Sequence, residues 1–125
     1  MSLLDDQLRV LQEEFADASI KQLPDGSHVV TVPGVDLPQG WLLSQTTVKF
    51  HLAPSYPHGK PDCFWAEPAL RLKNGAQPQN TNIQAIPGTS EAWLWFSWHA
   101  SHWNPNRDTL TTYMNIIRER LRRVQ

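Results

Sequence analysis

The chain contains a single cysteine, Cys63, which has no partner for an intrachain disulfide bond. This count gives no support for a secreted, disulfide-stabilised domain. The sequence also lacks an apolar run of about 20 residues, the length of a membrane-spanning helix. Its first residues turn acidic at once, at Asp5 and Asp6, so no secretion signal is expected. These absences predict a cytoplasmic protein that does not enter membranes.

Neither sign of charge dominates the composition, because the formal net charge is -1 at pH 7. The balance therefore favours neither nucleic acid nor an anionic membrane as a partner. The glycines are scattered among turns and form no phosphate-binding loop, so no cofactor is expected. Hydrophobic residues make up 40% and charged residues 18% of the 125 residues, as in folded proteins. A single domain over residues 1–125 is the expectation.

The charges are nevertheless polarised along the chain. The start is acidic, and the end is basic through Arg107, Arg118, Arg120, Arg122 and Arg123. Two interpretations stay open, namely solvated helix faces and a charged docking surface.

Hydrophobic periodicity and turn residues predict an α+β fold. Leu4, Leu8 and Leu11 form an apolar stripe behind the capping residue Ser2, which is typical of a helix. The expected elements are a helix at 3–18, strands at 28–32 (ended by Pro33-Gly34) and 47–52, strand pieces at 63–65 and 70–72, a polar loop at 74–91, an extended aromatic segment at 92–98 and a helix capped by Asp108. This order predicts an N-terminal helix, an antiparallel meander of about four strands, a long loop and a C-terminal helix.

Residues 93–105 carry the densest functional signal, with four of the six tryptophans and two of the five histidines. Ser97, His99 and His102 offer a nucleophile and two bases, and on a strand Ser97 and His99 share one face. The alternative is that they are ordinary polar residues at the end of a strand. No metal is expected, because zinc requires four ligands, or three and a water molecule, and two histidines do not suffice.

Cys63 is the other candidate nucleophile. Free cysteine usually packs as a small hydrophobic residue, and this is the alternative to catalysis here. A nucleophilic cysteine needs a lowered pKa, from a cation or a helix N-terminus. His58 and Lys60 are close in sequence, but the pattern does not indicate that they face the sulfur.

The strand that runs into Tyr56-Pro57-His58-Gly59-Lys60-Pro61 resembles the core of ubiquitin-conjugating (UBC) enzymes. Trp103-Asn104-Pro105 and the helix after it are similar to the Trp-Ser-Pro and helix that follow that family's active cysteine. More closely, nearly the whole chain resembles the prokaryotic conjugating-enzyme family E. The resemblance implies a UBC-like fold, and ubiquitin-like protein and its activating enzyme as partners.

The chain departs from the eukaryotic family at the active site. Counting back from Trp103 to the position of the family's cysteine reaches Trp95, and the His-Pro-Asn motif is missing. The resemblance therefore implies first a UBC-like component of a bacterial ubiquitin-like pathway that binds the ubiquitin-like protein or its activating enzyme. Trp95, Trp98 and Trp103 would form the binding surface, since tryptophan is often central to interfaces. Such pathways also encode a JAB-type peptidase, and some defend against phage.

An active carrier is the alternative. Ser97 would hold the ubiquitin-like protein as an oxyester, assisted by His99 or His102, or Cys63 would hold it as a thioester. A more remote alternative is an unrelated hydrolase that uses the same serine and histidines.

Overall fold

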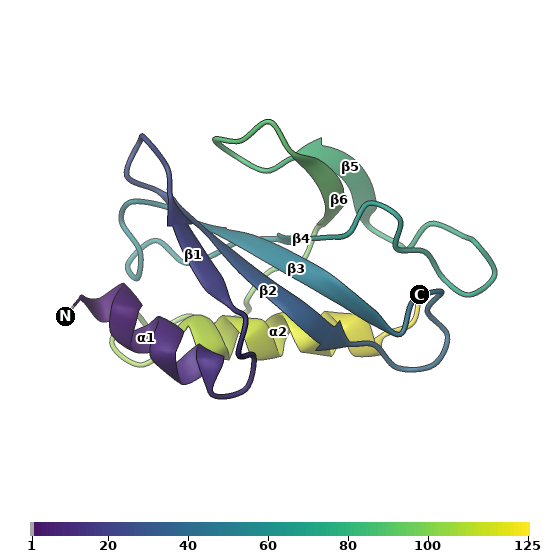
Figure 1. The fold of residues 1–125 in the computed structure, drawn as a ribbon, viewed down its shortest axis with the longest axis horizontal. Coiled ribbons are helices and arrows are strands. Elements are labelled where there is room, and N and C mark those ends of the chain that lie inside the picture. The colour runs from purple at the N-terminus through teal and green to yellow at the C-terminus, as the bar shows by residue number, and fades with distance from the viewer. Residues whose placement is uncertain (1) are drawn as a thin grey trace.

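The computed structural model describes residues 2–125. Its elements, in chain order, are α1 (Leu3–Gln12), β1 (Ser19–Gln22), β2 (His28–Asp36), β3 (Gln45–Leu52), β4 (Phe64–Ala66), β5 (Thr81–Ala85), β6 (Ala92–Phe96) and α2 (Leu110–Arg122). The strands form one antiparallel sheet in the spatial order β1-β2-β3-β4-β6-β5. Figure 1 shows both helices below the sheet, on one of its faces. The predicted α+β architecture is confirmed.

The main core lies between the sheet and the helices. Alternate residues of β3 point into it, as the polar–apolar alternation of that segment predicts. The apolar stripe of α2 packs against them through Leu110, Tyr113, Met114, Ile117 and Leu121. From α1, Leu11 is fully buried and Leu4 and Leu8 are partly buried. The apolar stripe predicted for the first helix is therefore confirmed, and the C-terminal helix likewise buries one apolar face.

A smaller apolar cluster covers part of the opposite face of the sheet. It consists of Leu23, Val29, Trp65 and Ile86, with Trp93 and Trp95 packed against it. Strand β6 also contributes Leu94 and Phe96 to the main core. Successive side chains of a strand point to opposite faces, so this extended aromatic run supplies both clusters.

The N-terminal helix is shorter than the predicted 3–18. It begins after Ser2, whose side chain accepts a hydrogen bond from the Asp5 amide, but it ends at Gln12. The Gln12 side chain then donates to the Ala18 carbonyl at 2.9 Å, which holds the chain in a turn toward β1. Phe15 and Ala18 pack on the main core from this turn. The apolar residues after Gln12 therefore reach the core without being part of the helix.

Strand β2 runs through the stop predicted at Pro33-Gly34. Its register against β3 shifts between Val32 and Val35, which marks a β-bulge. Gly34 has a φ of +73°, a conformation that glycine adopts without steric cost. The bulge also accommodates Pro33, which has no N–H for the ladder. The expected stop is thus a local irregularity within one longer strand.

The polar loop predicted for 74–91 contains strand β5. This strand pairs with the whole of β6, from Thr81 opposite Phe96 to Ala85 opposite Ala92. Its side chains are almost all exposed, so the segment has no apolar alternation from which a strand could be predicted.

Two further expectations are wrong in detail. The strand piece at 70–72 forms only an isolated bridge between Leu72 and Trp41. The final helix is capped by Thr109, whose side chain accepts from the Thr112 amide, and not by Asp108. Asp108 instead accepts from the Asn104 amide at 2.7 Å, and so closes the turn that precedes the helix.

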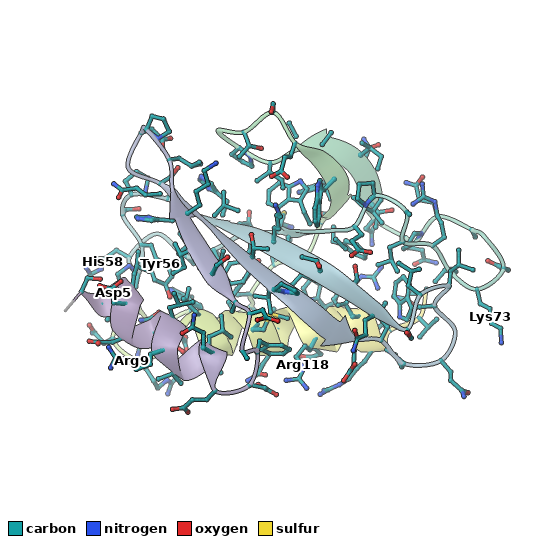
Figure 2. All side chains as sticks on the ribbon, viewed as in Figure 1. Asp5, Arg9, Tyr56, His58, Lys73 and Arg118 are labelled. Carbon is teal, nitrogen blue, oxygen red and sulfur yellow. The ribbon has the colours of Figure 1, made fainter. Side chains whose placement is uncertain are left out.

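Gln7 of α1 joins three segments of the fold. Its side-chain oxygen accepts hydrogen bonds from the Tyr56 hydroxyl at 2.6 Å and from the Leu110 amide at 3.1 Å. Figure 2 shows Tyr56 beside the first turns of α1, near Asp5. The proline-rich segment 53–61 and the start of α2 are therefore anchored to the first helix.

The basic residues near the end of the chain differ in their surroundings. Arg118 pairs with Glu14 at 2.6 Å, between α2 and the turn after α1. Arg120 is only 2% exposed, and it donates to the backbone carbonyls of Gln79, Arg123 and Gln125. Arg120 therefore belongs to the interior and not to a charged surface. Neither described helix has the length and apolar character needed to cross a membrane.

Candidate functional site

Cys63 is the residue just before β4, at the end of the proline-rich segment. Its φ is 60°, in the left-handed region that residues other than glycine seldom adopt. The Cys63 amide donates to the Trp98 carbonyl at 3.0 Å, and the Tyr113 hydroxyl donates to the Cys63 carbonyl at 2.6 Å. Contacts to the chain after β6 and to α2 thus fix the backbone of this residue from both sides.

The Cys63 sulfur lies beside a histidine–aspartate pair. His99, in the segment after β6, contacts Asp62 through its Nδ1 and the carboxylate Oδ1 at 2.5 Å. The sulfur, a ring nitrogen of His99 and a carboxylate oxygen of Asp62 all lie within 4.8 Å of one another. Cys63 is 8% exposed, whereas the other two side chains are more than half exposed. We call Asp62, Cys63 and His99 the thiol cluster.

The surroundings of Cys63 favour the protonated form of its thiol. Burial raises the pKa of the Cys63 thiol, and the nearby charge of Asp62 raises it further. Hydrogen bonding to the Trp98 backbone and the Trp95 side chain acts in the opposite direction without cancelling the effect of burial. A thiol in this state needs a base that removes its proton during the reaction.

His99 is the imidazole nearest to this thiol within the thiol cluster, although the two side chains share no hydrogen bond in the described residues. We assign the ring proton to Nδ1, because this nitrogen faces the Asp62 carboxylate. The assignment leaves Nε2 as the proton acceptor of the ring. The Asp62 carboxylate holds the Nδ1 side of the imidazole, the same contact that the carboxylate makes in nucleophile–histidine–aspartate sites.

Ser97 lies one residue beyond β6, so the strand geometry that would place it on one face with His99 does not extend to it. Its amide donates to the Asn80 carbonyl at 2.9 Å. Within residues 2–125, the Ser97 hydroxyl forms no hydrogen bond, and His99 contacts Asp62 instead. The structure therefore gives Ser97 no hydrogen-bonded base, and its role as a nucleophile stays a prediction.

His102 is exposed and, over the described part of the chain, takes part in no hydrogen bond or ion pair. It lines a groove of about 270 Å³ between residues 98–102 and α2, where Ile116, Glu119 and Arg123 form the other wall. His102 does not belong to the thiol cluster, although His99 lines the same groove. A role for His102 also stays a prediction.

Trp103, one of the three tryptophans predicted to form a binding surface, has a clear packing role. Its Nε1–H donates to the Pro57 carbonyl at 2.8 Å. Its ring lies 6.2 Å from the ring of Tyr56 and 6.4 Å from that of Tyr113. Trp103 therefore joins the proline-rich segment to α2.

Trp95 and Trp98 pack against different clusters. Trp95 belongs to β6 and packs on the smaller apolar cluster. Trp98 packs on the main core, with the guanidinium groups of Arg120 and Arg123 at 6.0 and 5.1 Å from its ring. Both rings are half-buried, which leaves part of each for contact with a partner.

Asp62 is the member of the thiol cluster that sequence reasoning missed. The only sign in the sequence that Asp62 could belong to a site was its position next to Cys63. Adjacency in the sequence does not indicate that two side chains act together. The contact with His99 spans 37 positions of the chain. It exists because β4 and β6 are neighbours in the sheet, which makes the residues at their ends meet.

The match to a known family agrees with this fold. A family model described as prokaryotic E2 family E matches residues 3–124, nearly the whole chain. No curated protein and no solved structure matches it. E2 proteins are the conjugating components of ubiquitin-like pathways, and their helix–sheet–helix order is the one observed here. The chain belongs to the prokaryotic E2 family E, and it is a UBC-like conjugation component.

Proposed function

We propose that this protein receives a ubiquitin-like protein from an activating enzyme and carries it as a thioester on Cys63. The observation that supports this most strongly is the grouping of the Cys63 sulfur with His99 and Asp62 within 4.8 Å. Family membership supports the class of partner, because E2-like proteins act between an activating enzyme and a target.

The transfer follows from the chemistry of the three side chains. The Cys63 thiol gives its proton to His99, and the sulfur attacks the activated C-terminal carbonyl carbon of the ubiquitin-like protein. A carbon–sulfur bond forms, and the bond from that carbon to the activating group breaks. Asp62 stabilises the protonated imidazole that results. The proton then leaves with the activating group or passes to water.

Cys63 is favoured over Ser97 because of its neighbours. A hydroxyl is a weak nucleophile without a base in hydrogen-bond contact, and Ser97 has none within residues 2–125. A thiol is intrinsically the stronger nucleophile, and an imidazole and a carboxylate lie within 4.8 Å of the Cys63 sulfur, whereas no such pair is hydrogen-bonded to Ser97 in the described residues. The oxyester at Ser97 is thus the alternative outcome of the same experiment.

The test is reconstitution with a ubiquitin-like protein and an activating enzyme, sought first among the genes that flank this one. The proteins are incubated with ATP and separated on gels with and without reductant and hydroxylamine. We expect an adduct that reductant removes and that Cys63→Ala abolishes. His99→Gln should slow its formation by about 100-fold or more, the usual contribution of a general base.

Two control variants make the result specific. His102→Gln alters an exposed imidazole outside the thiol cluster and should load at the normal rate. Ser97→Ala should also load normally. An adduct that resists reductant, yields to hydroxylamine and disappears in Ser97→Ala would instead establish the oxyester. No adduct under any condition contradicts both carrier mechanisms.

A binding role without acyl transfer is the second candidate, and the small exposed fraction of Cys63, 8%, favours it. Trp98 and the groove beside it would then contact the ubiquitin-like protein or its activating enzyme. Trp98→Ala should weaken that binding by about 30-fold, which corresponds to about 2 kcal/mol at an interface hot spot. Unchanged affinity in both Trp98→Ala and Trp95→Ala, measured by calorimetry, contradicts this role. Trp103 is left unaltered because it packs in the fold.

A further inference from the structure

We infer that the thiol cluster of Asp62, Cys63 and His99 is a binding site for a divalent transition-metal ion, with zinc as the best-fitting ion. The cluster offers one thiolate sulfur, one imidazole nitrogen and one carboxylate oxygen, all within 4.8 Å of one another. Zinc accepts this combination of ligands and takes three protein ligands with a water molecule in its open sites. The inference goes beyond the proposed carrier function, because acyl transfer needs no metal.

The local backbone favours a defined ligand geometry. The Cys63 amide donates to the Trp98 carbonyl at 3.0 Å, and the Tyr113 hydroxyl donates to the Cys63 carbonyl at 2.6 Å. Asp62 is its neighbour in the chain, and His99 follows Trp98 directly. The backbone near each ligand is therefore ordered, and the contact between His99 and Asp62 already brings two of the three ligand side chains together before an ion binds.

The exposure of the cluster supplies the fourth coordination position. The side chains of His99 and Asp62 are 58% and 55% exposed, while Cys63 is buried. An ion that bridges the three atoms thus keeps one side open to water, as in three-ligand zinc sites. Access from solvent also gives the ion a path into the site.

The charges balance on binding. The Cys63 S–H bond breaks, its proton passes to solvent, and a sulfur–zinc bond forms. The thiolate and the Asp62 carboxylate together neutralise the two positive charges of the ion, and the neutral imidazole adds a lone pair. The hydrogen bond between His99 and Asp62 is replaced by two bonds to the metal, and the ring proton of His99 moves from Nδ1 to Nε2 through solvent, so the imidazole stays neutral. Mg²⁺ and Ca²⁺ fit poorly, because they require several oxygen ligands and the cluster offers one carboxylate.

The experiment uses Co²⁺ as a spectroscopic substitute for zinc. The reduced, chelator-treated full chain is titrated with Co²⁺ without oxygen, and the thiolate-to-cobalt charge-transfer absorption is recorded. We expect this absorption in the unaltered protein, its loss on addition of Zn²⁺, and its absence in Cys63→Ser. His99→Gln and Asp62→Asn should each weaken binding by at least about 10-fold, a loss that even the supporting partners of metal ligands can cause.

His102→Gln is the matched control, because it removes an imidazole of the same segment that lies outside the cluster. It should bind Co²⁺ like the unaltered protein. Circular dichroism checks that each variant is folded, and Zn²⁺ should raise the Tm of the unaltered chain but not that of Cys63→Ser.

Several results would overturn the inference. One is no absorption in a protein whose Cys63 is shown by thiol titration to be reduced. Another is normal Co²⁺ affinity in folded His99→Gln or Asp62→Asn. A third is a loss of Co²⁺ affinity in His102→Gln as large as in the cluster variants, which would mean that the ion binds elsewhere. Because zinc and an acyl group need the same sulfur, they exclude each other there. The titration uses neither partner protein, so its failure leaves the carrier function untouched, and failure of loading leaves the metal site untouched.

Discussion

At the scale of single residues, Cys63 combines an uncommon backbone conformation with a protected thiol. Its φ of 60° is maintained by contacts to Trp98 and Tyr113, which are distant in the sequence. A non-glycine residue in this region costs free energy that the surrounding structure must offset, and such residues gather at functional sites. The sequence around Cys63 contains no sign of this conformation, because its cause lies in residues that only folding brings close.

The pH dependence of Cys63 alkylation follows from its burial. Its thiol pKa is raised in the folded chain, mainly by burial, so the thiolate forms at higher pH than in the unfolded chain. The neutral thiol's contribution to stability is fully present below the unfolded-state pKa and is lost as pH rises through the folded-state pKa. We therefore expect the iodoacetamide rate to reach half its alkaline maximum at higher pH in native protein than in urea.

The comparison needs only mass spectrometry of the single cysteine at a series of pH values. Equal midpoints would contradict the effect of burial, and a lower midpoint in the native protein would show that a neighbour stabilises the thiolate. In that case Cys63 would react without a base, and His99→Gln should not slow its loading.

At the scale of helices and strands, the elements with strong apolar periodicity were predictable. The face of α2 and the alternation of β3 follow directly from the sequence, since both elements bury one side against the core. Strand β5 was not predictable, because it exposes nearly all its side chains and is recruited by pairing with β6. Strand β2 continues past Pro33-Gly34 because a bulge forms there. In the sequence alone, a Pro-Gly pair indicates the end of a strand.

The start of α2 offers a test of its capping residues. The Thr109 side chain accepts from the Thr112 amide, and the Thr112 side chain accepts from the Thr109 amide. Thr109→Ala should lower the free energy of unfolding by about 1 kcal/mol, the usual value of an N-cap. Urea denaturation monitored by circular dichroism measures this change.

The reciprocal geometry makes a second variant informative. Since the two threonines act as one capping box, the combined Thr109→Ala and Thr112→Val change should cost less than the sum of the single changes. Additive costs would mean that the two side chains stabilise the helix independently, contrary to the hydrogen bonds described above.

At the scale of the whole molecule, the candidate site is a product of topology. Cys63 and His99 could be selected from the sequence as chemically competent residues, but their grouping with Asp62 could not. It requires that β4 and β6 lie side by side, with β5 placed outside β6. The predicted partnership of Ser97 and His99 rested on local strand geometry, which ends at Phe96. Local patterns thus identified candidate groups, while long-range pairing determined which of them meet.

Gln7 is the polar contact that connects the helices to the proline-rich segment. Gln7→Met keeps similar bulk but leaves the Tyr56 hydroxyl and the Leu110 amide without their acceptor. An unsatisfied buried donor costs about 1–3 kcal/mol, so we expect a loss of about 2 kcal/mol or more in urea denaturation. Gln22→Met, at an exposed position of β1, is the control and should change stability little. Adding Tyr56→Phe to Gln7→Met should restore part of the loss, and a double variant no better than the single one would argue against this account.

The position of β5 at the border of the sheet has a consequence for the behaviour of the protein in concentrated solution. Beyond β5 the described chain adds no further strand, and the side chains of residues 82–85 are exposed. The strand carries Ile83, which is 46% exposed, and has none of the charges or prolines that usually protect a sheet border. An unprotected border recruits extended chains of any origin, including those of other copies. Colloidal stability should therefore depend on this short strand as well as on the small net charge of the molecule.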